Sequence, residues 1–456
     1  MTITDQRIAV RRRSHRELPR VRPVHVLPVV LQMLIWAGAA AILLLWWRDT
    51  GAVADAGDWM TGAGRITGLL AGYGCAILLL LMARIPMLER TIGGDRLARW
   101  HAMGGRYTVS LTVAHVVLIL VGYSLDSQTG LVYQAIQVVG TYPEMLGATA
   151  GFLLLLFTGI ISARAARRRM RYEVWHYLHF LTYLAIFLAF GHQLANGADF
   201  IGNPAARAAW YALYVGVAAV LAWFRFLVPL RRGLRHRLRV TQVRAEADGV
   251  VSIYLTGPHV AELRAEPGQY FRWRFLTPGL WWAANPYSLS AAPDGRGLRI
   301  TVKALGGHSA ALARLRPGTA VWAEGPYGAL TARRRTGRGT LLLAGGIGIT
   351  PLRALFESLP GDVVLLYRAR RAADLAFREE LDRLAAVRGA RVHYSVSEFP
   401  GSVVPMTARA LTRLVPDLAD RDVYLCGPPR MTDAAGPALR EAGVPRRRIH
   451  HESFAL

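Results

Sequence analysis

The chain has 456 residues, which is enough for more than one domain. Hydrophobic residues make up 53% of it, but the long apolar runs lie in the first half, and the second half reads as soluble protein. The net charge of +25 comes almost wholly from arginine, since Lys303 is the only lysine. The two cysteines, Cys75 and Cys426, are too few for a four-thiolate iron–sulfur cluster and indicate no disulfide framework.

Six apolar stretches approach the length that a helix needs to cross a bilayer. They are Leu27–Trp47, Ile66–Met82, Thr108–Tyr123, Leu146–Ile161, Trp175–Phe190 and Ala208–Leu227. Seventeen arginines lie in the N-terminal tail and in the second-to-third and fourth-to-fifth connections, whereas the opposite connections hold only Arg48, Arg65 and Arg207. This positive-inside asymmetry predicts a multi-pass membrane protein with both termini cytoplasmic. It also accounts for the basic charge without a nucleic-acid partner.

The same pattern divides the first half of the chain. Residues 1–26 are expected to be a basic cytoplasmic tail. The apolar run after them exceeds the about 7–15 residues of a signal-peptide core, so it is interpreted as an uncleaved first span. Residues 27–230 are therefore expected to form a membrane-spanning all-α bundle of six helices, in contact with membrane lipid. A basic hinge, Arg231–Arg239, then begins the soluble part.

The soluble part is expected to hold two domains. From about Val240 to Thr331, short alternating strands are separated by Gly/Pro turns, which predicts an antiparallel β-barrel within residues 231–335. From Thr340 the pattern changes to strands alternating with helices, which predicts an α/β domain with a parallel sheet within residues 336–456.

Four histidines lie in or beside the apolar segments, in two pairs: His101 and His115, then His179 and His192. Ionisable side chains are costly at that depth and usually functional. Fourteen residues advance a helix by about 21 Å and bring it back to nearly the same face, whereas thirteen leave an offset of about 140° that local overwinding or tilt must correct. His176 fits no better in angle and worse in depth. Two helices with one histidine each at two depths could hold two haems; the alternative is four core histidines bonded to backbone carbonyls.

A Gly-rich turn follows the apolar strand that ends near Ala344. Glycines such as Gly345, Gly346 and Gly348 let the backbone approach a pyrophosphate, and the helix that begins near Thr350 and Pro351 offers free N–H groups. Tight strand–helix packing is the alternative explanation of the same turn.

Two further motifs lie in the predicted barrel. The stretch Asn285–Ser290 offers an aromatic ring and hydroxyls that could hold an isoalloxazine, and Gly306–Ser309 opens a short helix that could hold a phosphate. Taken singly, each also fits ordinary turn chemistry.

Together these features resemble the ferric reductase / NADPH oxidase superfamily, in which a six-span haem domain is fused to a ferredoxin–NADP-reductase-like module for flavin and nicotinamide. The resemblance covers about residues 65–456. It depends on Trp100-His101, His115, Trp175-His176, His179, His192, Pro267-Gly268-Gln269-Tyr270, Asn285-Pro286-Tyr287-Ser288, Gly306–Ser309, Glu324-Gly325-Pro326-Tyr327-Gly328, Gly345–Pro351, Cys426-Gly427-Pro428 and Glu452-Ser453-Phe454.

The resemblance implies two b-type haems, FAD and NADPH or NADH as cofactors, and a role for each matching residue. His101 and His179 would ligate the cytoplasmic-side haem, and His115 and His192 the outer one. The residues implied in FAD binding are Tyr287, Ser288, Gln269, Lys303, Gly307 and Ser309. The residues implied at the nicotinamide cofactor are Gly345, Gly346, Gly348 and Thr350, with Cys426, Glu452 and Phe454 around the place where nicotinamide meets flavin.

The chain departs from the pattern at Asn285, where many relatives have an arginine that pairs with the FAD pyrophosphate; an amide cannot form that ion pair. Arg65 is similar to an arginine that NADPH oxidases place near the outer haem, and its alternative role is an interfacial anchor. Arg368, Arg370 and the neighbouring Arg371 follow the second strand of the α/β domain without an acidic neighbour, which favours NADPH over NADH.

The resemblance implies an NAD(P)H-dependent transmembrane oxidoreductase that delivers electrons to an extracytoplasmic acceptor. Oxygen, giving superoxide, is favoured slightly because of Arg65, and a ferric or cupric chelate is the alternative. A membrane haem subunit that serves an extracytoplasmic protein acceptor is a second possibility. A transporter or proton channel with a regulatory nucleotide domain is disfavoured, because a regulatory site needs neither Cys426 nor Phe454.

Overall fold

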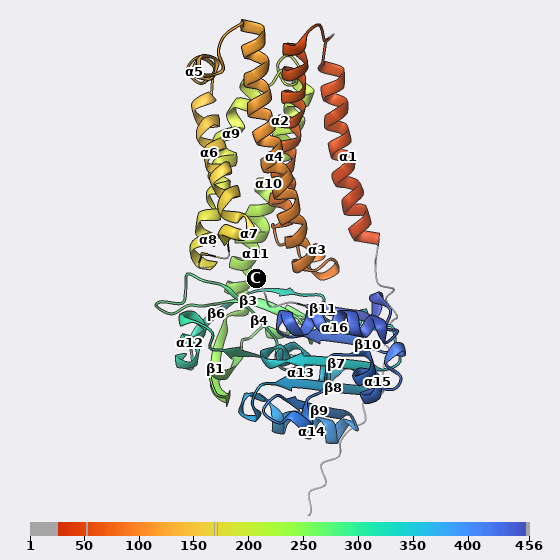
Figure 1. The fold of residues 1–456 in the computed structure, drawn as a ribbon. Coiled ribbons are helices and arrows are strands. Elements are labelled where there is room, and N and C mark those ends of the chain that lie inside the picture. The colour runs from red at the N-terminus through yellow and green to blue at the C-terminus, as the bar shows by residue number, and fades with distance from the viewer. Residues whose placement is uncertain (1–25, 52, 168, 171, 453–456) are drawn as a thin grey trace, which may run out of the picture.

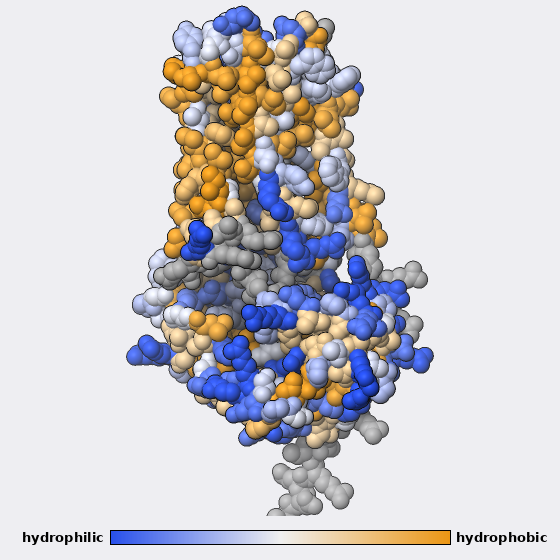
Figure 2. Space-filling model, viewed as in Figure 1, coloured by the Kyte–Doolittle hydropathy of each residue, from blue (hydrophilic) through white to orange (hydrophobic). Residues whose placement is uncertain are grey.

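The computed structural model describes residues 26–51, 53–167, 169–170 and 172–452. These residues form a tall helical bundle standing on a soluble α/β module (Figure 1). Figure 2 shows hydrophobic residues covering the bundle and hydrophilic residues gathering over the module. Phe454 and the N-terminal tail lie outside the described residues.

The bundle contains six helices that are long and apolar enough to cross a membrane, as the sequence predicts. They are α1 (Val26–Asp49), α2 (Ala56–Leu81), α4 (Gly94–Ser127), α6 (Met145–Ser162), the pair α8 (Tyr172–His179) and α9 (Leu181–Asn196), and α10 (Pro204–Ala222) with its continuation. Shorter helices α3 (Pro86–Thr91), α5 (Leu131–Thr141) and α7 (Arg164–Arg167) lie in the connections. Most spans extend beyond the predicted ends, because polar residues continue each helix past its apolar stretch.

The expected hinge at Arg231–Arg239 is helical over most of its length. A π-helical turn, η1 (Trp223–Leu227), joins α10 to α11 (Val228–His236). Strand β1 (Leu238–Ala247) begins directly afterwards, so only Arg237 separates the last helix of the bundle from the barrel. The sixth span therefore enters the module without a flexible linker.

Helices α2 and α4 pack closely because glycines of α2 face α4. An added Cβ would lie 2.8 Å from the side chain of Ile119 at Gly64 and 2.6 Å from Nδ1 of His115 at Gly68. Small residues at four-residue intervals let two membrane helices approach until their backbones nearly touch. This close approach brings the face of α4 that carries the histidines against α2.

The barrel is a six-stranded antiparallel sheet in the order β4-β3-β6-β1-β2-β5. Besides β1, its strands are β2 (Val250–Thr256), β3 (Tyr270–Phe275), β4 (Asn285–Ser288), β5 (Gly297–Lys303) and β6 (Ala320–Tyr327). A bridge between Leu289 and Ile300 joins the two edges, so the sheet closes as predicted. Phe271, Trp273 and Phe275 alternate along β3 and fill the barrel, each fully buried.

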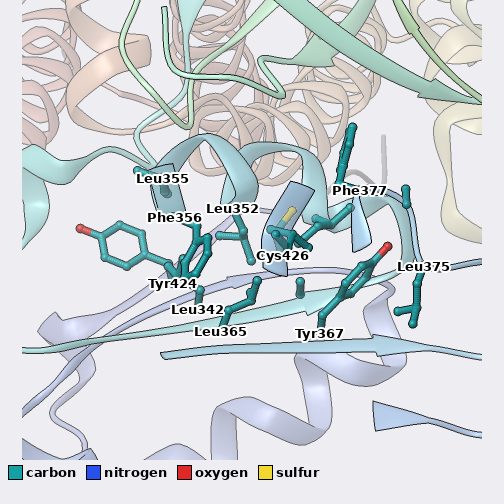
Figure 3. Packing of buried hydrophobic residues seen from close by; sticks show 14 of the residues in the cluster. Leu342, Leu352, Leu355, Phe356, Leu365, Tyr367, Leu375, Phe377, Tyr424 and Cys426 are labelled. Atoms are coloured by element: carbon teal, nitrogen blue, oxygen red, sulfur yellow. The ribbon is translucent and has the colours of Figure 1, made fainter. Parts of the chain in front are cut away.

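The last domain is a five-stranded parallel sheet in the order β11-β10-β7-β8-β9, as the sequence predicts in type. Its strands are β7 (Thr340–Gly345), β8 (Val363–Ala369), β9 (Arg391–Val396), β10 (Asp422–Cys426) and β11 (Ile449–Glu452). Its main helices are α13 (Ile349–Ser358), α14 (Arg378–Arg388), α15 (Ala408–Leu414) and α16 (Pro429–Glu441). Figure 3 shows Leu342, Leu365, Tyr367 and Tyr424 of the sheet packed against α13.

Candidate functional site

The four predicted histidines meet as two pairs inside the bundle. The imidazole centroids of His101 and His179 are 6.0 Å apart, and those of His115 and His192 are 6.4 Å apart. A metal ion held between two facing imidazoles at the usual nitrogen–metal distance of about 2 Å places the ring centroids roughly 6 Å apart. Both pairs therefore fit one metal centre each, at two depths separated by about 21 Å along α4.

Carbonyl groups of α2 orient the two histidines of α4. Nδ1 of His115 lies 2.8 Å from the carbonyl oxygen of Gly64, and Nδ1 of His101 lies 3.1 Å from that of Leu78. A carbonyl oxygen only accepts, so each Nδ1 carries the proton and each Nε2 is left as the metal-binding atom. The same contacts would suit core histidines, but a core role does not require two facing imidazole pairs.

A local change of helix geometry accounts for part of the 140° offset between His179 and His192. The helix is interrupted at Phe180, where hydrogen bonds of the 3₁₀ type run from Phe180 N to Tyr177 O (3.1 Å) and from Tyr183 N to Phe180 O (3.0 Å). A 3₁₀ turn advances about 120° per residue and so overwinds the chain relative to an α-helix. The interruption therefore rotates His192 toward the side of the bundle that His179 faces.

Arg65 has a partner that the sequence did not indicate. Its guanidinium binds the carboxylate of Asp199, with Nη2 2.6 Å from Oδ1 and Nε 3.3 Å from Oδ2. The Asp199 side chain is only 3% exposed. The ion pair joins α2 to the connection between α9 and α10, 134 residues later, and holds Arg65 beside Gly64, the carbonyl partner of His115.

In the barrel, three of the residues implied in flavin binding, Gln269, Tyr287 and Ser288, lie where β3 meets β4. Tyr287 is opposite Phe271 in the register, and burial raises the pKa of its phenol to about 12. Ser288 Oγ is buried and has no hydrogen-bond partner among the described residues. A buried hydroxyl without a partner is costly unless a ligand completes it. Gln269 is buried and accepts from the N–H of Glu266 (2.8 Å).

The second barrel motif forms the predicted short helix, α12 (Gly307–Ala311). The hydroxyl of Ser309 accepts from the N–H groups of Leu305 (2.9 Å) and Gly306 (3.1 Å), so it caps the helix. Asn285, which replaces the usual arginine, bonds His308 of this helix (Nδ2 to Nδ1, 2.8 Å). Lys303 ends β5 just before the loop, and Gly307 begins the helix.

The Gly-rich turn lies between β7 and α13, as predicted. Gly346 has φ +53°, and a Cβ added there would meet nothing within 4 Å, so this backbone is open to a ligand. Gly345 and Gly348, in contrast, are closed in by neighbouring chain: an added Cβ would contact Met431 at Gly345 and the backbone of Cys426 at Gly348. Thr350 closes the first turn of α13 through its hydroxyl, which donates to Ile347 O (3.0 Å). The two explanations of this turn therefore apply to different glycines: Gly346 is open to a ligand, whereas Gly345 and Gly348 allow tight packing.

Three neighbouring strands bring the remaining predicted residues to the carboxyl edge of the parallel sheet. Cys426 at the end of β10 is opposite Ala344 of β7 on one side and Glu452 of β11 on the other. Gly328, which directly follows β6 of the barrel, lies beside the Glu452 carboxylate. A Cβ added at Gly328 would be 3.0 Å from Oε1 of Glu452. This edge thus faces the barrel, at the position where open α/β sheets bind ligands.

The arginine cluster at the end of β8 contains two kinds of side chain, those bound to a carboxylate and those that are not. Arg368 is opposite Gly345 in the register and half-buried, and Arg370 is exposed. Arg371 instead binds Asp374, with Nη2 2.9 Å from Oδ1. Arg368 and Arg370 therefore remain as the candidates for a ligand phosphate.

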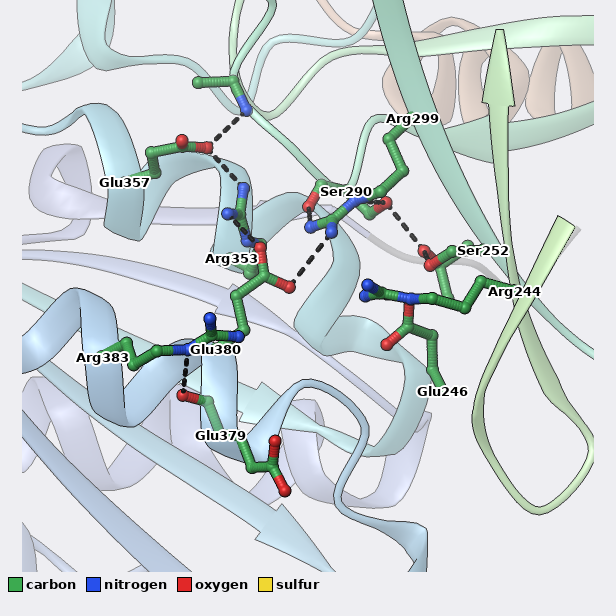
Figure 4. A network of polar contacts seen from close by, with 12 residues as sticks. Arg244, Glu246, Ser252, Ser290, Arg299, Arg353, Glu357, Glu379, Glu380 and Arg383 are labelled. Carbon is green, nitrogen blue, oxygen red and sulfur yellow. Dashed lines mark hydrogen bonds and ion pairs between the residues drawn. The ribbon is translucent and has the colours of Figure 1, made fainter. Parts of the chain in front are cut away.

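Polar networks that the sequence did not indicate join the domains. Figure 4 shows Arg299 of β5 binding Glu380 of α14 (3.0 Å), which also binds Arg353 of α13, so the barrel is fixed to the α/β domain. Arg84, after α2, forms an ion pair with Glu324 of β6. Arg334 of the module donates to the carbonyl of Thr91 (2.9 Å) in α3. No local sequence signal could have matched these partners, because each pair is distant in the chain.

Two family models match the chain. The description "ferric reductase like transmembrane component" matches residues 67–190, and "oxidoreductase NAD-binding domain" matches residues 342–436. The first match contains three of the four paired histidines, His101, His115 and His179. The second match contains the Gly-rich turn and Cys426.

Curated relatives match the soluble half. The ferredoxin reductase component of a 3-ketosteroid-9-alpha-monooxygenase from Mycolicibacterium smegmatis is 33% identical over 236 residues, which are 48% of this chain and 65% of the relative. Ferredoxin–NADP reductase B of Sorangium cellulosum is 32% identical over 190 residues, which are 37% of this chain and 77% of the relative. The chain spans a little under two thirds (65% and 62%) of the first two curated relatives.

Among solved structures, the flavohem-like FAD/NAD binding domain of a Vibrio cholerae nitric oxide dioxygenase aligns with a TM-score of 0.43 and 29% identity, over 48% of this chain and 98% of that domain. The matched membrane component, the reductase relatives and the six apolar helices agree on one architecture. The chain is therefore a multi-pass membrane protein in which a ferric-reductase-like transmembrane domain is joined to an oxidoreductase module that belongs with the ferredoxin–NADP-reductase-like proteins.

Proposed function

We propose that this chain transfers electrons from cytoplasmic NAD(P)H through FAD and two b-type haems to oxygen on the other side of a bacterial plasma membrane, giving superoxide. The observation that carries the proposal is the presence of two facing histidine pairs, with imidazole centroids 6.0 and 6.4 Å apart, at two depths of a membrane-spanning bundle. A single buried histidine pair would not connect the two faces of a bilayer about 30 Å thick.

In this proposal His101 and His179 hold the haem nearer the module, and His115 and His192 hold the outer haem. Tyr287 and Ser288 would contact the flavin, with His308 and Ser309 at its phosphate side. When bound, FAD turns the two-electron donor into a source of single electrons, and each haem iron carries one electron at a time. Because both histidines of each pair would hold the iron, the acceptor would be reduced at the edge of the haem and not at the metal.

The chain's own residues would select and place the donor. The open backbone at Gly346, beside the positive dipole end of α13, suits a pyrophosphate. Arg368 and Arg370 suit the 2′-phosphate that distinguishes NADPH from NADH. Cys426 and Glu452, on neighbouring strands that face the barrel, would surround the nicotinamide where it meets the flavin.

The described arginines support the proposed orientation. Arg84 lies in the connection between the second and third spans, and Arg96 and Arg99 lie in the first turns of α4 on the same side. On this side Arg84 pairs with Glu324 of the module, and Arg334 of the module donates to the carbonyl of Thr91. A cationic face toward the cytoplasm is the usual arrangement in membrane proteins. We therefore place the module, and both termini, in the cytoplasm.

Arg65 no longer favours oxygen over a metal chelate as the acceptor, because its guanidinium is bound to Asp199. Oxygen is retained as the proposed acceptor on the resemblance to NADPH oxidases, with a metal chelate or a protein partner as outcomes of the test.

The test is an optical spectrum of the purified chain, reduced with NADPH without oxygen and then exposed to oxygen. We expect the Soret and α bands of reduced low-spin haem, followed by reoxidation with superoxide formation. A chain that stays colourless when supplied with haemin would refute the haem proposal, and cytochrome c reduction insensitive to superoxide dismutase would exclude oxygen.

A further inference from the structure

The loop between β3 and β4, residues 276–284, carries exposed apolar side chains although it belongs to the soluble module. We call it the aromatic loop. Trp281 is 60% exposed, and Trp282 and Leu276 are also exposed. The loop contains no charged residue. A solvent-exposed tryptophan beside other apolar side chains usually marks an interaction surface.

The aromatic loop reaches the level of the first turn of a membrane span. The ring of Trp282 lies 6.3 Å from that of Tyr177, which is the fourth residue of the span Val174–Asn196. Tyr177 is 52% exposed and lies beside Phe180, with 6.3 Å between ring centroids. The exposed aromatic surface therefore continues from the span onto the barrel without a break.

The loop holds these side chains in place. Nη1 of Arg274 donates to the carbonyls of Trp281 (2.8 Å) and Trp282 (3.2 Å), and the indole N–H of Trp282 donates to Gly279 O (3.0 Å). Leu280, one residue before Trp281, is buried in the barrel core. The loop is thus anchored on one side while Trp281 points away from the core.

We propose that the aromatic loop inserts Trp281 into the headgroup region of the bilayer on the module's side. Tryptophan and tyrosine are favoured at that depth because one part of the ring is apolar and the other part hydrogen-bonds. Lipid is the occupant that fits, because the surface is continuous with the lipid-facing side of the fifth span. The contact goes beyond the spans themselves: it makes part of the flavin-binding barrel a peripheral membrane surface.

The insertion would also position the candidate flavin site. Trp282 lies 6.2 Å from His308 between ring centroids, and His308 accepts from Asn285 at 2.8 Å. A chain of contacts therefore runs from the bilayer surface to the two residues at the phosphate side of the flavin. Lipid contact at Trp281 would fix the barrel relative to the bundle.

The test places an environment-sensitive fluorophore on the full chain through Trp281→Cys, with Val387→Cys as the control. Both native cysteines are buried, so the introduced thiol reacts selectively. Val387 is 86% exposed and belongs to α14, the helix that Figure 1 shows at the end of the module away from the bundle. The labelled chains are placed in phosphatidylcholine/phosphatidylglycerol vesicles with and without a nitroxide-labelled headgroup.

We expect the label at position 281 to emit at shorter wavelength than the control and to lose emission when nitroxide lipid is present, while the control does neither. Equal aqueous spectra at both positions would overturn the proposal. A shifted but unquenched label at position 281 would also overturn it, because it would indicate a protein partner or a second copy of the chain. The readout requires neither haem nor flavin, so its failure is distinguishable from failure of the proposed function.

Discussion

The bundle and the module bury their apolar residues to very different extents. In the module, whole strands such as Leu341–Ala344 and Val363–Tyr367 are almost completely buried. In the bundle, residues such as Phe187 (75% exposed) and Leu146 (74% exposed) face outward from the protein. Lipid is as apolar as these side chains, so it replaces the partners that a soluble domain must supply.

The two halves therefore specify their sites in different ways. The module places ligand-binding loops at the ends of strands that a dense core holds rigid. The bundle has few buried residues, so it positions its histidines through glycine-lined helix contacts, backbone carbonyls and the ion pair of Arg65 with Asp199. A single small change should consequently be more damaging in the bundle, and the predictions below test this difference.

Removal of an imidazole should have the largest effect. His115→Leu should lower the haem content by about one per chain and stop transmembrane electron flow, because no second ligand replaces it. Dye reduction by NADPH at the module should continue, since the module has its own core. Haem content per chain from a pyridine haemochrome assay checks this, and unchanged stoichiometry would exclude His115 as a ligand.

The buried ion pair of the bundle should be next. Arg65→Ala leaves the Asp199 carboxylate buried without its partner, which typically costs about 3–5 kcal/mol. The matched control is Arg235→Ala, which breaks an exposed pair with Glu262 in the module and should leave stability unchanged. Thermal unfolding of both variants in the same detergent gives the comparison. Equal decreases in Tm for the two variants would show that the bundle does not depend specially on the Arg65–Asp199 contact.

Filling the glycine contact should disturb the outer histidine pair. In Gly68→Ala the new methyl meets the imidazole of His115, and overpacking of this kind costs about 1–3 kcal/mol. Gly216→Ala on α10 is the control, because a Cβ there meets nothing within 4 Å. We expect lower haem retention or a broadened haem spectrum in the first variant alone. Identical spectra would show that α4 can move away without loss.

At the module, the arginines at the end of β8 should affect the choice between NADPH and NADH as donor. Replacing Arg368 and Arg370 with Ala should raise the KM for NADPH about tenfold, roughly 1.4 kcal/mol, with little change for NADH. Arg371→Ala should change the ratio less, because Asp374 engages that guanidinium. Steady-state dye reduction with both donors measures it. Equal effects on NADPH and NADH would remove the case for phosphate recognition.

The smallest effect concerns acid stability of the module. Burial alone would raise the pKa of Asp422, but hydrogen bonds from His450, Gly337 and Thr336 outweigh it and keep that pKa below its usual value. A lowered folded-state pKa gives stability that is complete above the unfolded value, about 4, and lost as the pH falls through the folded value. Thermal unfolding between pH 6 and 3 should therefore fall less steeply in Asp422→Asn. A parallel decline in both proteins would assign the acid lability elsewhere.

The sequence predicted what depends on local pattern. The six spans, the barrel, the parallel sheet and the two-depth arrangement of the histidines follow from apolar length, alternation and helical spacing. The strands β1, β4, β9 and β11 were not assigned as strands. Strand β1 begins inside the expected basic hinge, and β4 and β11 have only four residues each. The 3₁₀ interruption at Phe180 could not be foreseen, since the spacing of His179 and His192 was judged on a regular helix.

Partners that are distant in the chain were also beyond the sequence. Arg65 had two interpretations, and neither included Asp199, because nothing local links residues 134 positions apart. Asn285 was noted as a missing charge, whereas the structure gives its amide a neighbour, His308, to which it donates a hydrogen bond. Such pairs depend on how the whole chain packs, and only the packed structure reveals them.

The direct passage from α11 into β1 through Arg237 has a consequence for how the two halves could be recombined. Each residue inserted in or removed from α11 would turn the barrel by about 100° around the helix axis and displace it by about 1.5 Å. A transplanted reductase module would therefore keep its orientation only if the helical phase of the graft were preserved. A turn in either sense would separate Arg84 from Glu324, and the donor side would then face the wrong part of the membrane domain.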